Sequence, residues 1–81
     1  MECPLKIMRE IKGDSRDDLA HKFRVNHTTV FRWEKNVMMP SAENFLEISV
    51  YLEMSVEKAI RMWIEWSESE KGESVIQIIN S

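Results

Sequence analysis

Apolar residues recur at helical spacing in five segments of the chain, with polar stretches between them. The five sets fall within residues 5–11, 19–23, 30–33, 45–52 and 56–64. Each set follows a residue that suits the start of a helix, and these residues are Pro4, Ser15, Asn26, Ser41 and Ser55. The pattern therefore predicts five helices within residues 1–66.

The predicted helices also carry end signals. Gly13 follows the first set and Asn36 follows the third, and both residue types accept the left-handed conformation in which many helices end. Pro40 prevents the third helix from continuing. Ser15 and Asp18 have the spacing of the two partners of a capping box. These signals predict short helices joined by tight turns.

The end of the chain breaks this pattern. Residues 67–74 are polar and acidic, which is typical of a linker. Residues 75–79 are rich in β-branched side chains, which favours a short strand, although the same run also has the spacing of a short sixth helix. The sequence thus divides into a helical domain, residues 1–66, and an acidic linker with an apolar C-terminal arm, residues 67–81.

Composition narrows the class of protein. The chain has 81 residues, of which 43% are hydrophobic and 31% charged, and this suits one folded domain. No apolar run reaches the roughly 18–20 residues of a membrane helix, so we expect no membrane partner. The start of the chain lacks the pattern of a secretory signal, and its single cysteine cannot form an internal disulfide, so we expect a cytoplasmic protein. Only two glycines and two prolines are present, which favours an all-α fold.

The net charge of −3 hides an uneven distribution. Residues 1–40 carry eight Lys or Arg and six Asp or Glu, whereas residues 41–81 carry three and eight. The first part can therefore present a local basic face to a nucleic acid. The acidic second part would be repelled by phosphate, so we expect it to point elsewhere.

Residues 16–35 hold the most informative pattern. Two short predicted helices are joined by a turn of three or four residues, and small Ala20 suits the close approach of helices that cross at about 90–120°. The apolar positions that would pack this pair on the remaining helices are Leu19, Phe23, Val25, Val30 and Trp33. The face of the second helix that is left free carries His27, Thr28, Phe31, Arg32 and Lys35.

This part of the chain resembles the helix-turn-helix domains of the phage repressor and Cro family, also called the XRE family. The resemblance spans residues 5–64, and its motifs are Ser15–Ala20, Val25–Glu34, Pro40-Ser41 and Leu52–Glu57. In the family, Leu52–Ser55 would read as leucine, glycine, a β-branched residue and serine. The resemblance implies a five-helix repressor-like bundle that binds double-stranded DNA.

The chain departs from the family pattern at three places. Arg24 stands where the turn usually has glycine, so either it adopts a left-handed conformation or the turn differs. Arg16 replaces a glutamine that contacts phosphate, and an arginine can make that contact more strongly. Residues 37–39 (Val-Met-Met) replace an often basic stretch, so one phosphate-contacting site is missing or replaced.

The resemblance also implies which side chains meet DNA. The candidates for reading base edges are His27, Thr28, Phe31 and Arg32. Arg32 can pair bidentately with guanine, or it can be a solvated arginine beside a carboxylate. Phe31 either meets a thymine methyl group or packs against its own domain. The candidates for phosphate contacts are Arg16, Asn26, Thr29 and Lys35, and the alternative for each is simple capping or exposure.

The C-terminal half offers candidates for self-association. Trp63 completes the core spacing of the last helix, which leaves Trp66 as an interface candidate. The expected dimerisation residues are Trp66, Val75, Ile76, Ile78 and Ile79. As a strand, residues 75–79 would pair with the same strand of a second subunit in an antiparallel ribbon, since an unpaired edge seeks a partner.

These observations lead to one expected function and one alternative. We expect a small Cro-type homodimer that represses transcription by occupying an inverted-repeat operator. The alternative is an antitoxin or adaptor whose acidic C-terminal half binds a protein partner. Cys3 has no nearby catalytic partner, no glycine-rich phosphate loop is present, and Glu34 suits a local salt bridge. We therefore expect no enzyme activity, no metal and no cofactor.

Overall fold

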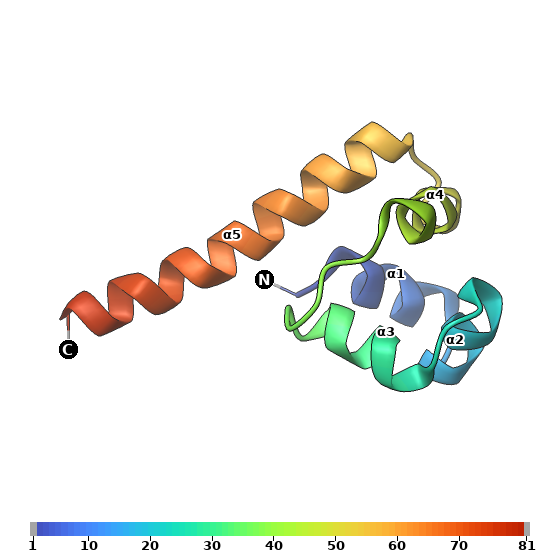
Figure 1. The fold of residues 1–81 in the computed structure, drawn as a ribbon, viewed down its shortest axis with the longest axis horizontal. Helices are drawn as coiled ribbons and strands as arrows, with labels where there is room; N and C mark the ends of the chain where they lie inside the picture. The colour runs from blue at the N-terminus through green and yellow to red at the C-terminus, as the bar shows by residue number, and fades with distance from the viewer. Residues whose placement is uncertain (1, 81) are drawn as a thin grey trace.

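The computed structural model describes the backbone of residues 2–80 and the side chains of residues 2–70. Its elements are the helices α1 (Pro4–Lys12), α2 (Arg16–Phe23), α3 (His27–Glu34), α4 (Ala42–Tyr51) and α5 (Val56–Asn80). Figure 1 shows the four shorter helices gathered beside the first half of α5. Since residues 2–80 contain helices and no strand, the predicted all-α fold is confirmed.

Serine side chains cap three helices where the sequence predicts them. Ser15 Oγ accepts a hydrogen bond from the Asp18 backbone N–H at 3.0 Å, and the Asp18 carboxylate accepts one from the Ser15 N–H at 2.8 Å. The bond from the Ser15 N–H favours the charged carboxylate and holds the pKa of Asp18 below its ordinary value. Ser41 and Ser55 accept from the N–H three residues on, at 3.2 Å each. The predicted helix starts at these serines are confirmed.

Each of the first four helices is linked to the next through a left-handed residue, and only one of these four residues is glycine. Gly13 has a φ of 77°, while Arg24, Asn36 and Glu53 have φ values of 57°, 59° and 57°. After each of them, the next backbone N–H donates to the carbonyl five residues earlier at 2.9–3.1 Å, which satisfies the end of a helix. Arg24 therefore adopts the left-handed conformation instead of altering the turn. Glu53 does the same where the family has glycine.

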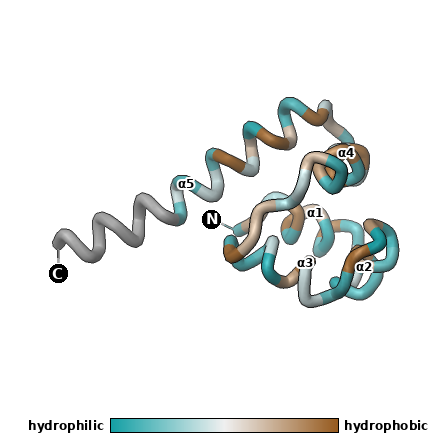
Figure 2. Tube along the Cα trace, viewed as in Figure 1, coloured by the Kyte–Doolittle hydropathy of each residue, from teal (hydrophilic) through white to brown (hydrophobic). Residues whose placement is uncertain are grey.

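The core draws on all five helices. Its largest fully buried apolar side chains within them are Leu5, Leu19, Val30, Trp33, Ile48 and Trp63. The Trp63 ring meets Phe45 and Trp66 edge to face, with centroids 5.6 and 5.8 Å apart. Figure 2 shows hydrophobic positions alternating with hydrophilic ones along the first half of α5, as a helix with one buried face requires. Trp66 is only 3% exposed, so it belongs to this core.

A buried carboxylate joins the first three helices. The Glu34 side chain, at the end of α3, is 1% exposed and accepts hydrogen bonds from two arginines. Arg9 of α1 donates through Nε at 2.9 Å and Nη2 at 3.1 Å, and Arg16 of α2 donates through Nε at 3.0 Å. These bonds hold the pKa of Arg9 above its ordinary value. The salt bridge expected for Glu34 is confirmed, and it is buried.

The turn that follows α3 and the middle of α5 are joined by two neutral hydrogen bonds. Ser67 Oγ donates to Asn36 Oδ1 at 2.7 Å, and Asn36 Nδ2 donates to the Ser67 carbonyl at 3.2 Å. Ser67 is 2% exposed, so the stretch predicted as a linker begins with a buried residue. This pair sets where α5 passes the turn that follows α3.

The last helix is longer than the sequence pattern predicts. The α5 backbone stays helical to Asn80, so residues 67–74 are helix and not a linker. The favoured strand at residues 75–79 is wrong, and the helical alternative holds as a continuation of α5. No proline interrupts residues 56–80, and Gly72 alone disfavours a helix by only about 1 kcal/mol.

Two predictions about this region stay predictions. The side chains of residues 71–81 lie outside the described part of the chain, so no contact bears on the dimerisation residues predicted for this segment: Val75, Ile76, Ile78 and Ile79. The division of the chain after residue 66 is likewise untested.

Glu53→Gly is expected to stabilise the fold by up to about 1 kcal/mol. Glycine removes roughly 1–2 kcal/mol of left-handed strain and loses about 0.5–1 kcal/mol to backbone entropy. Glu47→Gly, in the exposed middle of α4, is the matched control and is expected to destabilise by about 1 kcal/mol. Urea unfolding measures both variants. A Glu53→Gly protein that is as unstable as Glu47→Gly would contradict the strain argument.

Arg9→Ala is expected to destabilise the fold by about 3–5 kcal/mol, because it leaves a buried carboxylate with one of its two partners. Lys6→Ala, on the same helix, removes ion pairs with the exposed Glu2 and Glu10 and is expected to lose less than about 1 kcal/mol. Thermal unfolding followed by circular dichroism compares the two variants. Equal losses of stability in the two variants would show that the buried ion pair stabilises the fold no more than a surface ion pair does.

Candidate nucleic-acid interface

The helix α3 has one buried and one exposed face. Val30 and Trp33, with 0% and 1% exposure, fix α3 on α2 and the core. The opposite face carries five exposed side chains, His27, Thr28, Phe31, Arg32 and Lys35. The structure thus gathers all four predicted base-reading residues, together with Lys35, on one surface. We call this set the α3 face.

The start of α3 leaves backbone donors available. Asn26 is extended, with φ −77° and ψ 151°, and its side chain makes no capping hydrogen bond. Its backbone position before the helix is as predicted, while its exposed amide is left for another contact. The first N–H groups of a helix have no acceptor within the helix, and the helix dipole adds positive potential there. This end of α3 therefore suits a phosphate oxygen.

Phe31 lies close to two cations, Arg16 of α2 and Lys35 of the α3 face. The Arg16 guanidinium carbon is 5.2 Å from the centroid of the ring, and Lys35 Nζ is 5.6 Å from it. Both distances are in the range of cation–π attraction. Phe31 keeps 42% of its surface exposed, so it is not packed into its own domain. The exposed part of the ring can contact an apolar group of a partner, and the positive charges of Arg16 and Lys35 would then lie near that group.

Arg16 is positioned by a hydrogen bond to the buried side of the domain. Its Nε bonds to the buried Glu34 carboxylate at 3.0 Å, and its side chain remains 37% exposed. Glu34 is in turn held by Arg9, so Arg9 supports the α3 face without lying on it. Sequence reasoning missed Arg9, because a single arginine on a short amphipathic helix looks like an ordinary surface residue.

The remaining phosphate candidates differ in exposure. Thr29 is partly buried, whereas Asn26 and Lys35 are exposed. On the α3 face, His27 Nδ1 lies 4.0 Å from Asp17 Oδ1 of α2, and both side chains are well exposed. Val37 is 72% exposed, so the apolar stretch predicted to replace a basic one reaches the surface.

The acidic region lies elsewhere in the fold. Helix α5 packs on α4 and α1, and its carboxylates at Glu57, Glu65 and Glu68 are exposed. Figure 1 shows the first turns of α5 and the helix α3 on opposite sides of the bundle. Repulsion between Glu57, in these first turns, and a polyanion on the α3 face is therefore weak, because screening removes most of it beyond about 8–10 Å. Further along α5, Glu70 lines a pocket together with Lys35, so the acidic residues there lie near the end of α3.

Other kinds of site were sought in the described part of the chain. It contains no group of three or more His, Cys, Asp or Glu placed to hold a metal ion. It also contains no helix that is both long and apolar enough to cross a membrane. Cys3 is 1% exposed, and burial raises the pKa of its thiol to about 12, so it is poorly suited to act as a nucleophile.

The sequence was compared with family models, curated proteins and solved structures. The model of a helix-turn-helix family matches residues 5–58, which is more than half of the chain. The comparisons with curated proteins and with solved structures found no match.

Proposed function

The chain belongs to the helix-turn-helix family of DNA-binding transcription regulators of the XRE type, and from that premise we propose that it is a cytoplasmic Cro-type repressor that binds its operator as a homodimer. The family is one of DNA-binding regulators and not of enzymes. The proposal concerns which side chains read DNA, how two copies share a site, and how binding regulates transcription.

The α3 face carries the proposal. It combines an exposed arginine, an exposed aromatic ring beside two cations, and a helix start with open backbone donors. In this fold the second helix enters the major groove, with its first residues at the base edges. His27 and Thr28 would lie deepest, Arg32 would pair with guanine O6 and N7, and Phe31 would meet a thymine methyl group.

Phosphate contacts would set the register of α3 in the groove. Arg16 and Lys35 both lie beside Phe31, so in the complex they would place positive charge next to the base contacts. Asn26 and Thr29 would add neutral contacts at the start of the helix. Occupation of the operator by the bundle would then exclude other proteins from the same DNA, which accounts for repression without a catalytic step.

Arg32→Ala is expected to weaken binding to the operator by about 1–3 kcal/mol and to relax preference at one base pair. Lys35→Ala is expected to weaken all DNA sequences alike and to lower the salt slope by about one unit. Gel shifts on the operator and on scrambled DNA, at several salt concentrations, separate the two effects. Lys35→Ala is used for the phosphate contact in place of Arg16→Ala, because Arg16→Ala would also disturb the buried Glu34.

Operator binding that survives Arg32→Ala unchanged would place the reading face elsewhere. Circular dichroism of both variants shows whether they fold, and both side chains are exposed.

The operator is expected to be an inverted repeat whose half-sites lie about 34 Å apart, centre to centre. One eight-residue recognition helix covers too little DNA for useful discrimination, and a two-fold dimer repeats its contacts. Selection of bound DNA from a random pool, followed by footprinting, measures the spacing. Protection of one asymmetric half-site by a monomer would rule out the dimeric mode.

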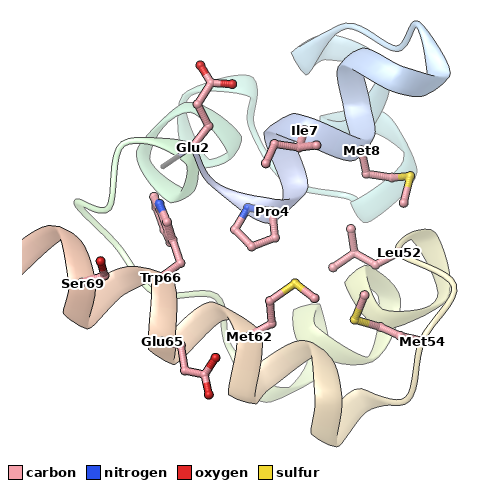
Figure 3. Close-up of a pocket in the computed structure, with 10 residues that line it drawn as sticks. All are labelled: Glu2, Pro4, Ile7, Met8, Leu52, Met54, Met62, Glu65, Trp66 and Ser69. Atoms are coloured by element: carbon pink, nitrogen blue, oxygen red, sulfur yellow. The ribbon is translucent and has the colours of Figure 1, made fainter.

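A second function, as a protein-binding module, is favoured by an apolar pocket of about 470 Å³. Figure 3 shows it between the start of α1 and the first half of α5, with Met8, Leu52, Met54 and Met62 among its walls. Flexible methionines suit surfaces that accept a partner. An antitoxin or adaptor would use this pocket, and loss of α3-face side chains would leave its main activity intact. The gel shift above separates the two functions.

A further inference from the structure

The pocket between the start of α1 and the first half of α5 has the size of a small-molecule site. Its volume is about 470 Å³. Ligand sites in proteins usually enclose about 300–1,000 Å³ and are lined mainly by apolar and aromatic side chains. The pocket therefore has room for one small organic molecule.

Three separate segments build the walls of this pocket. Pro4 and Met8 come from α1, Leu52 lies at the end of α4, and Met62 and Trp66 come from α5. Figure 3 shows these side chains arranged around one common space. Leu52 and Trp66 are only 4% and 3% exposed, so part of the wall belongs to the core. The pocket is thus a product of how three helices pack and not a patch on one helix.

The walls suit an apolar body of variable outline. Met8, Met54 and Met62 are partly buried, and their unbranched, polarisable side chains can follow the shape of an aliphatic or aromatic group. Trp66 adds an aromatic wall. An apolar group that enters this space leaves water, which is favourable.

The charges that line the pocket all have one sign. Among the described residues of its wall, Glu2 and Glu65 are charged, and neither Lys nor Arg is present. Figure 3 shows the two carboxylates at the edge, one before α1 and one on α5. Glu2 is paired with Lys6 at 3.0 Å, whereas Glu65 is exposed and forms no ion pair with another described residue. The edge therefore attracts a cation and repels an anion.

We propose that this pocket binds a small organic cation, whose apolar body lies against the methionines and Trp66 and whose ammonium group meets Glu65 at the edge. Such a ligand combines the two features of the pocket, an apolar interior and a negative edge. The proposal goes beyond the proposed DNA binding and does not depend on it, because the pocket and the α3 face share no residue.

The first test compares three probes that share a naphthyl body and differ in charge. They are naphthylethylamine, which is a cation at neutral pH, naphthylethanol, which is neutral, and naphthylacetate, which is an anion. Titration of the full chain, followed by the shifts of its backbone amides in NMR spectra, gives the Kd and the place of binding. The amine is expected to bind about tenfold more tightly than the acetate, with the alcohol between them.

The shifted amides are expected to cluster at the start of α1, the end of α4 and residues 62–69 of α5. An acetate that binds as tightly as the amine, or shifts scattered over the whole chain, would overturn the proposal. If none of the three probes binds, the small-molecule site is likewise excluded, and the pocket is left to a protein partner.

The second test removes the charge at the edge. Glu65→Gln is expected to weaken binding of the amine about fivefold and to leave binding of naphthylethanol unchanged. Glu47→Gln, exposed on α4 and outside the pocket, makes the same change in net charge and is expected to leave both probes unchanged. An amine that binds wild type and Glu65→Gln equally well would contradict the assigned role of this carboxylate.

The third test fills the pocket. Ile7 lines it and is 41% exposed, so Ile7→Lys can place an aliphatic stem and a competing ammonium group there, and it is expected to weaken the amine at least about tenfold. Ile11→Lys is the matched control, because Ile11 is 73% exposed on the same helix and does not line the pocket. Circular dichroism confirms that both variants fold. Binding that survives Ile7→Lys would place the probe elsewhere and defeat the proposal.

Discussion

The buried Glu34 carboxylate is the interaction on which the arrangement of α1, α2 and α3 depends. A carboxylate with 1% exposure is tolerated only where donors replace its lost water, and Arg9 and Arg16 supply three hydrogen bonds. The same bonds fix where α3 lies relative to α2. Through Arg16 they also fix one of the two cations beside Phe31. Stability and the geometry of the candidate interface are therefore linked at one residue.

The turns provide a second constraint. Arg24 and Glu53 hold left-handed conformations that glycine would adopt without strain, yet the five-residue hydrogen bonds that close the helices are all made. The helix starts at Ser15, Ser41 and Ser55 are also fully capped. Good caps and a continuous core offset the strain at two turns, so the chain keeps the fold of its family without the family's glycines.

The fold keeps two surfaces with different chemistry apart. The α3 face is cationic and points away from the bundle, while the pocket along the first turns of α5 is apolar with acidic neighbours. A DNA-binding protein benefits from this separation, because acidic groups next to phosphate would oppose DNA binding. The uneven charge along the sequence becomes an uneven charge in space because α3 and α5 pack on different helices.

Local features of the sequence determined much of this protein. Apolar spacing, serine caps and the asparagine at position 36 predicted five helices and most of their ends, since these signals act within a few residues. The helix-turn-helix pattern likewise predicted which side chains share the α3 face. Tertiary structure alone decided the rest. The backbone of residues 67–80 continues α5 as helix, although residues 75–79 are rich in β-branched side chains that favour a strand. Strand propensity is weak here because the described bundle has no second strand for them to pair with. The partnership of Arg9 with Glu34 joins residues 25 positions apart, and no short-range pattern reports a contact between separate helices. The same holds for Phe31, whose contact with Arg16 depends on how α2 packs on α3.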